Sequence, residues 1–133
     1  MFLIELSDIE KEAFVSLCYH ASMSNGYVDE DESLVIKSYC QEMNIDYVSC
    51  DNAMPMEEAC NVFIASSDKI KKIVIFEILG VMLADGIYDE KEKEYVSTLS
   101  RRINVSTEVM NELTVLIEDY MECVKRISST IYN

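Results

Sequence analysis

The sequence predicts one compact all-α bundle of six to seven helices, built around two helical hairpins related by a pseudo-twofold axis. Apolar residues recur with the 3.6-residue spacing of helices, and half of the 133 residues are hydrophobic, which is enough for a real core. In addition, one pattern of an apolar lead-in, a glycine turn and an acidic restart occurs twice, at 23–32 and at 83–92, with an offset of 60 residues.

The first hairpin belongs to an internal repeat of about residues 8–46, within a single domain of residues 1–133. Ser7, with Glu10 three residues later, predicts the cap of a first helix. Gly26 can take the left-handed conformation and end that helix. The inward side chains expected here are Ala13, Phe14, Leu17, Cys18 and Ala21. A second helix should follow from about Asp29 to Met43, with Leu34, Val35, Tyr39 and Met43 inward.

The second repeat covers about residues 68–106. A short third helix after Pro55, with Cys60, Phe63 and Ile64 buried, should lead to a fourth helix capped at residues 66–68. The stretch 73–83 is apolar nearly all round, so we expect the fourth helix at the centre of the fold. A fifth helix should run from Asp89 to about Arg102, with Val96 and Leu99 inward.

The last predicted helix runs from Thr107 towards Ile131 and has one long apolar face. That face comprises Val109, Leu113, Leu116, Ile117, Tyr120, Val124 and Ile127. A single helical hairpin cannot bury its own apolar side. Two hairpins packed together can do so, with the third and sixth helices covering the remainder.

Charge narrows the possible functions. The chain has 25 acidic and 11 basic residues, a net charge of −14. Such a field repels phosphate backbones, which argues against nucleic acid, and attracts cations or a basic protein surface. The longest apolar stretch, residues 73–83, is too short to span a bilayer, and the first residues lack the basic region of a secretory signal. We therefore expect a cytoplasmic protein, either free or held at the inner face of the membrane through a partner.

The cysteines and the single histidine do not form an obvious reactive site. The five cysteines are odd in number and contain no Cys-x-x-Cys pair, so reduced and mostly buried thiols are expected: Cys18, Cys40, Cys50, Cys60 and Cys123. His20 is expected to be structural. No Ser-His-Asp or Cys-His set and no phosphate-binding loop can be assembled, so we expect a protein that is not an enzyme. Glu77 lies inside the apolar fourth helix, where the sequence favours a buried functional carboxylate and a surface position equally.

The acidic residues of the two turns are the candidate metal ligands. Asp29 with Glu32, and Asp89 with Glu92, are fully explained as helix caps. Capping does not explain Asp85 or the further acids at both turns. If the turns meet at the pseudo-axis, their oxygen ligands suit Ca²⁺, Mg²⁺ or Mn²⁺. The candidate set is Asp85, Asp89, Glu92, Asp29, Glu32 and Asn25. An EF-hand is excluded, because Glu90 and Val96 stand where a loop starting at Asp85 needs glycine and glutamate.

At these residues the chain resembles the TerB-like family, the bacterial tellurite-resistance-associated domain. Ala84-Asp85-Gly86 with Asp89 and Glu92 matches the small-residue-Asp-Gly turn and acidic restart of that family. In the first repeat, Asn25 stands where the family typically has Asp. The resemblance implies a duplicated helical fold, a role in tellurite or wider chemical-stress systems, a metal ion bound by acidic residues, and partners among tellurite-resistance components at the membrane.

Three function classes remain open from the sequence. The first is a non-enzymatic stress-response module that binds a divalent cation and a protein partner. The second is a metal-free interaction domain whose acidic face docks a basic surface. The third and least favoured is a carboxylate-based metal hydrolase, which would need an open metal position in a cleft.

Overall fold

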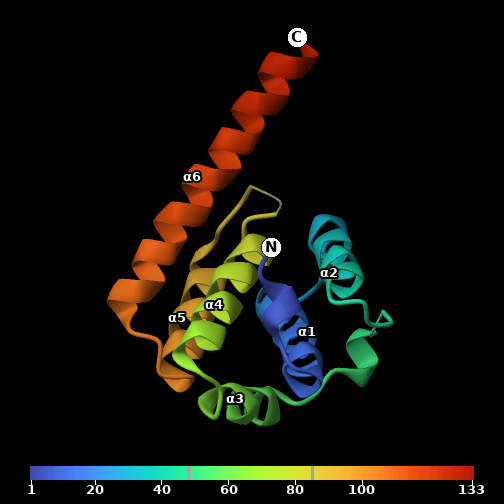
Figure 1. Ribbon diagram of the computed structural model, residues 1–133, viewed down its shortest axis with the longest axis vertical. Helices are drawn as coiled ribbons and strands as arrows, with labels where there is room; N and C mark the ends of the chain where they lie inside the picture. Colours follow the sequence, from blue (N-terminus) through green and yellow to red (C-terminus); the bar gives the residue numbers. More distant parts are fainter. Residues whose placement is uncertain (48, 85) are drawn as a thin grey trace.

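The computed structural model describes residues 1–47, 49–84 and 86–133, and these residues form helices and turns without a β-strand (Figure 1). This confirms the predicted all-α class. The α-helices of the described chain are α1 (Asp8–Ser22), α2 (Glu30–Glu42), α3 (Met56–Ile64), α4 (Asp68–Met82), α5 (Glu90–Arg102) and α6 (Thr107–Tyr132). Three short 3₁₀ turns accompany them: η1 (Leu3–Glu5), η2 (Met23–Asn25) and η3 (Cys50–Asn52).

The local structure repeats together with the sequence. Helix α4 begins and ends 60 residues after α1, and α5 begins and ends 60 residues after α2. Gly26 and Gly86 both have positive φ, 102° and 80°, a conformation that glycine adopts without steric cost. Asn44 and Asn104 end α2 and α5 with φ of 55° and 66°. The turn chemistry of the two repeats is therefore the same, while the superposition of the hairpins about a pseudo-twofold axis stays a prediction.

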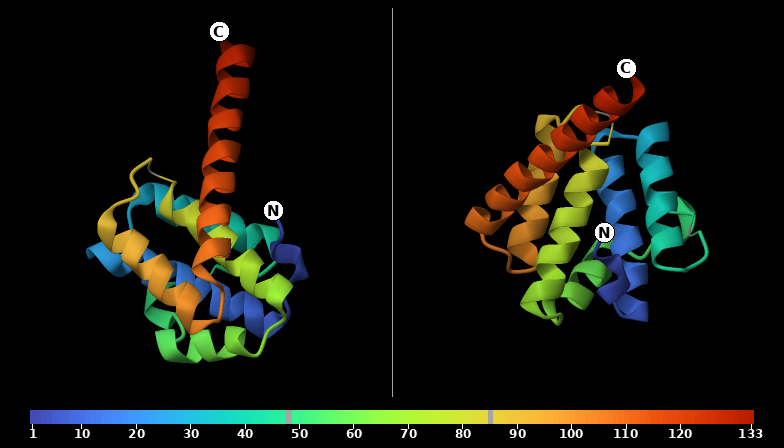
Figure 2. Two further views of the ribbon diagram at one scale, coloured as in Figure 1. Left: turned by 90° about the vertical axis from the view of Figure 1, so that its left-hand side faces the viewer. Right: turned by 45° about the horizontal axis from the view of Figure 1, so that its top comes forward.

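Helix α4 lies at the centre of the bundle, as its apolar sequence predicted. It contacts α1, α2, α3, α5 and α6, and the right panel of Figure 2 shows it between α1 and α5, with α6 crossing one end. Its inward side chains are fully buried; they include Val74, Ile75, Ile78, Leu79, Val81 and Met82. Burial of a large apolar side chain stabilises the folded state by about 1.5–3 kcal/mol relative to leaving it exposed.

Gly80 lets α2 approach α4 closely. The Tyr39 hydroxyl donates a hydrogen bond of 2.8 Å to the carbonyl oxygen of Glu77, one turn before Gly80. A Cβ atom at position 80 would lie 2.6 Å from that hydroxyl oxygen, closer than real Cβ contacts. The glycine in mid-helix therefore has a packing reason that offsets its low helix propensity.

Two predicted inward residues were wrong. Leu34 is 57% exposed, and the inward face of α2 is formed by Glu32, Ile36, Cys40 and Met43. The physical reason is that Glu32 folds back onto its own cap, and residues four apart share one face of a helix. In α3, Ile64 is exposed near the end of the helix, whereas Ala59, Cys60 and Phe63 are in the core.

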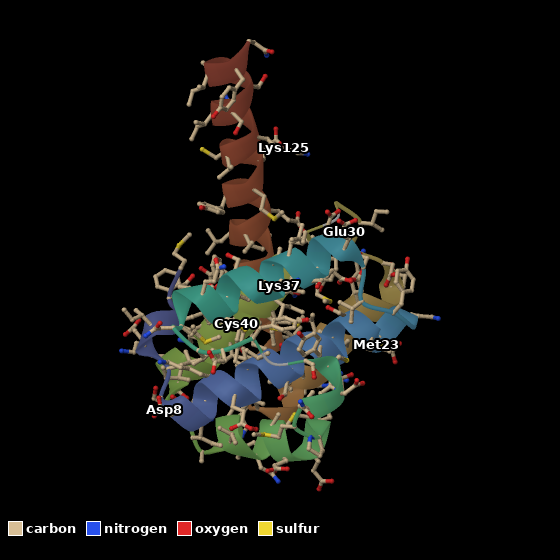
Figure 3. All side chains as sticks on the ribbon, turned by 90° about the vertical axis from the view of Figure 1, so that its right-hand side faces the viewer. Asp8, Met23, Glu30, Lys37, Cys40 and Lys125 are labelled. Carbon is tan, nitrogen blue, oxygen red and sulfur yellow. The ribbon has the colours of Figure 1, made fainter. Side chains whose placement is uncertain are left out.

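Helix α6 covers less of the bundle than predicted. Its first half packs on α4 and α5, and its second half extends away from the other helices (Figures 1 and 2). Of the predicted apolar face only Ile117 is buried, and Val109 and Leu113 are partly buried. Lys125 stands on the extending part, away from the body (Figure 3). No helix of the described residues combines the length and apolar character needed to cross a bilayer.

Candidate functional site

The two acidic turns lie at the same end of the bundle. The turn between α1 and α2 and the turn between α4 and α5 are seen together in both panels of Figure 2. Turn η2, which belongs to the first motif, contacts α5, which belongs to the second. Met23 and Glu30, which flank the first turn, also lie at one end of the molecule (Figure 3). The structure therefore brings the two repeated motifs into one region.

Each motif closes with a reciprocal capping box, as predicted. The Glu32 N–H donates to Asp29 Oδ1 at 2.8 Å, and the Asp29 N–H donates to Glu32 Oε1 at 3.3 Å. In the second motif the same two bonds measure 2.8 Å and 3.2 Å between Asp89 and Glu92. A cap of this kind contributes about 1 kcal/mol, so all four residues have a structural role.

The two capping glutamates are inside the protein rather than on its acidic surface. Glu32 and Glu92 are each only 1% exposed. Glu32 Oε1 accepts the capping hydrogen bond, whereas Oε2 is buried and has no hydrogen-bond partner among the described residues. The hydroxyl of Ser24, in η2, is also buried and lacks a partner within that part of the chain. A buried polar atom without a partner costs free energy, so a proton or a cation on the Glu32 carboxyl group would be stabilising.

The electrostatics of Glu32 show that the two motifs interact. Burial is the largest cause that raises the pKa of Glu32, which reaches about 8 in all. The backbone hydrogen bond from Asp29 opposes the rise, and the negative charges of Asp29 and Glu92 contribute to it. Repulsion by Glu92 means that the carboxyl groups of the two repeats are close enough to affect each other. Two neighbouring buried carboxylates cannot both be charged unless a cation lies between them. The pair therefore either keeps a proton on Glu32 at neutral pH or binds a positive ion.

The remaining predicted ligands are placed differently. Asp29 and Asp89 are partly buried and form the caps described above. Asp85 lies outside the described residues, as does the side chain of Asn25. Within the part of the chain that the structure describes, no three His, Cys, Asp or Glu side chains are grouped as metal ligands. The other acids of the two turns are exposed to solvent: Glu30, Asp31, Glu90 and Glu94.

Glu77 is a second buried carboxyl group, 3% exposed. Its side chain lies 3.4 Å from the α-amino group of Met1, which also pairs with Glu42 at 2.7 Å. Burial raises the pKa of Glu77, the amino group opposes this rise, and the charge of Glu42 adds to it. Glu77 is thus buried and ion-paired, and its main-chain carbonyl anchors Tyr39.

The sulfur and imidazole groups have structural surroundings. The cysteines carry reduced thiols: those of Cys18, Cys40 and Cys60 are buried, and those of Cys50 and Cys123 are exposed. Burial raises the pKa of the Cys18 thiol well above its usual range, which keeps it protonated and unreactive. A ring nitrogen of His20 lies 2.7 Å from the carbonyl oxygen of Met54, a bond that holds the segment before α3.

The sequence contained one pattern from which the burial of Glu32 and Glu92 could have been predicted. Glu32 precedes Ile36 by four residues, and Glu92 precedes Val96 by four, so each glutamate lies on the inward stripe of its helix. The acidic surroundings made these residues look like surface groups. No protein-family model, curated protein or solved structure matches this chain. The TerB-like resemblance therefore stays a prediction, supported by residues of this chain alone.

Proposed function

We propose that this protein is a non-enzymatic, TerB-like stress-response module that binds a divalent cation between its two acidic turns and acts through protein partners. The observation that supports it best is Glu32, whose buried Oε2 has no hydrogen-bond partner among the described residues. The charge of Glu92, from the second motif, acts on the same carboxyl group. A cation would neutralise this pair and satisfy the oxygen.

The donor set fits a hard cation. Carboxylate oxygens suit Ca²⁺, Mg²⁺ and Mn²⁺, whereas His20 is already hydrogen-bonded to the carbonyl oxygen of Met54. One oxygen of Glu32 already holds the N-terminus of its helix, so that side chain offers a single free oxygen. Water would supply part of the coordination shell, and we expect weak binding. Asp85 remains a proposed contributor, to be tested by substitution.

The position of the pair favours binding over catalysis. A catalytic metal keeps an open position that faces a substrate cleft. Glu32 and Glu92 are buried under their own helix ends, where a substrate has little access. The net charge of −14 favours a partner with a basic surface, and we propose tellurite-resistance components in the cytoplasm or at the membrane as such partners. A pull-down with those components tests this part.

The cation is tested by thermal unfolding with Ca²⁺, Mg²⁺ or Mn²⁺, each added to chelator-treated protein. A ligand at 100 times its Kd stabilises the folded state by about 2.7 kcal/mol, so the melting temperature should rise by several degrees. Glu32→Gln should abolish the rise. Glu30→Gln is the matched control, because it removes the same charge from an exposed position on the same helix and should leave the rise intact.

A metal-free interaction domain is the second candidate, and the capping boxes favour it. All four acids of the boxes are already engaged in helix caps, and a proton on Glu32 would relieve the repulsion without an ion. An unchanged melting temperature with millimolar levels of all three ions would select this second function. A rise that persists in Glu32→Gln would place any bound ion elsewhere and remove the proposed site.

A further inference from the structure

The second half of α6 carries an apolar seam with heptad spacing. The seam residues follow one another at alternating intervals of four and three: Leu113, Ile117, Tyr120, Val124, Ile127 and Ile131. The first two pack against the body, whereas the last four are between 42% and 67% exposed. A strict 3.5-residue repeat is the pattern of a helix that packs against another helix in a coiled coil. The exposed part of the seam therefore fits a helix.

Charge on α6 is kept away from this seam. The charged residues of the helix all occupy the three heptad positions farthest from it: Glu108, Glu112, Glu118, Asp119, Glu122, Lys125 and Arg126. The flanking positions, which select partners in coiled coils, are uncharged: Thr114, Leu116, Met121, Cys123, Ser128 and Thr130. Uncharged flanking positions do not repel an identical helix, and they provide no charges that would select a different helix as partner. The seam can therefore pair with the same seam of a second copy of the chain.

An apolar groove lies where the exposed seam meets the body. It has a volume of about 500 Å³, and its lining includes Phe2, Phe76, Leu116 and Tyr120. The Phe2 ring packs edge-on against the Phe76 ring, with the two ring centroids 5.9 Å apart, and Phe2 is 43% exposed. Lys69 and Lys72 line the same groove, and positive charge is favourable beside the C-terminal end of a helix.

We propose that α6 pairs with α6 of a second copy of the chain in an antiparallel coiled coil. The last turn of each helix then enters the groove of the other molecule. In this register Tyr120 packs on the partner's Ile131, and Val124 packs on the partner's Ile127. Because each copy carries a net charge of −14, the antiparallel arrangement is favoured: it holds the two bodies at opposite ends of the seam. The interface is isologous and closes as a dimer.

The apolar surface available approaches what such a dimer needs. The exposed side chains of seam and groove amount to on the order of 600 Å² per chain, taking about 160 Å² for a fully exposed large side chain. They are Met1, Phe2, Leu116, Tyr120, Val124, Ile127 and Ile131. Specific interfaces bury about 800 Å² per partner. We expect a dimer that dissociates on dilution.

The oligomeric state tests the seam directly. Light scattering and sedimentation from about 1 µM to about 500 µM should show a monomer–dimer equilibrium, since micromolar affinities fall in this range. Ile127→Asp should give a monomer at all these concentrations. Ser129→Asp, on the opposite face of the same helix, should dimerise as the unmodified chain does. Both residues are exposed, so circular dichroism should show folded protein in each case.

Disulfide trapping tests the antiparallel register. Positions 123 and 130 of opposite chains lie about 3 Å apart along the axis in the proposed pairing and about 10 Å apart in a parallel one. Thr130→Cys in a Cys50→Ser background should therefore give a covalent dimer on mild oxidation. Adding Cys123→Ser should abolish it.

Three outcomes would overturn the proposal. They are a monomer at every concentration, a dimer that survives Ile127→Asp, and a dimer whose cross-link does not need Cys123. A monomer that instead binds lipid vesicles through α6 would assign the seam to a membrane surface. The test does not involve the cation site, so either proposal can fail alone.

Discussion

The buried carboxyl of Glu32 should make the stability of this protein fall as the pH rises. Its pKa is about 8 in the folded chain against an ordinary value of 4.5. Between these values the unfolded chain has lost the proton while the folded chain keeps it, so unfolding is favoured by each rise in pH. Each pKa unit corresponds to about 1.4 kcal/mol, and the full effect of Glu32 is therefore about 5 kcal/mol.

The useful window runs from pH 6 to pH 8. Over these two units the contribution of Glu32 should fall by about 2 kcal/mol. For a domain of this size that corresponds to about 6–8 °C in melting temperature. Glu32→Gln removes the titrating group and keeps an oxygen that can accept the Asp29 N–H bond. The variant should lose much less stability across the window and should be the more stable protein at pH 8.

Urea denaturation in the presence of a chelator measures this effect without a contribution from bound cations. Glu30→Gln controls for the general loss of one negative charge, because Glu30 is exposed at the same helix end. Its stability should follow that of the unmodified chain at both pH values. If Glu32→Gln and the unmodified chain lose equal stability between pH 6 and pH 8, then Glu32 is already ionised at pH 6. Such a result would refute a raised pKa of Glu32 in the folded protein.

Three further predictions concern packing and accessibility. Gly80→Ala should cost about 1–2 kcal/mol in urea denaturation, because the new Cβ displaces the Tyr39 hydroxyl; Tyr39→Phe should reduce that cost in a double-mutant cycle, and a strictly additive result would contradict the reasoning. Ile36→Ala should cost about 2–5 kcal/mol and Leu34→Ala less than about 0.5 kcal/mol, and the reverse order would restore the register expected from sequence. A maleimide reagent should rapidly label only the exposed thiols of Cys50 and Cys123 in the native protein. Rapid labelling of three or more thiols would contradict the observed burial of the others.

The elements that sequence reasoning predicted well are those held by short-range interactions. The caps at Ser7, Asp29 and Asp89 and the glycine turns depend on hydrogen bonds between residues at most a few positions apart. Such bonds form in any tertiary setting. The apolar run of α4 likewise had to be central, because nothing else could cover it on all sides.

The residues of the candidate site were predicted from the sequence, but their burial was not. Sequence reasoning selected Glu32 and Glu92 and correctly explained them as caps. It predicted an acidic metal site between the two turns and did not predict that the glutamates are buried, whereas the structure has both of them inside the protein, with a raised pKa at Glu32. Burial depends on which helices pack over a side chain. That contribution comes from residues far away in the chain.

Caps and turns are local, so the order of residues predicts where the helices start and stop and that two stretches use the same turn chemistry. Long-range packing, in contrast, places Ile36 rather than Leu34 in the core and leaves the seam of α6 exposed after Ile117. Both depend on how far neighbouring helices extend over each face. An apolar stripe shows that a helix needs a partner, and packing decides whether its own chain supplies one.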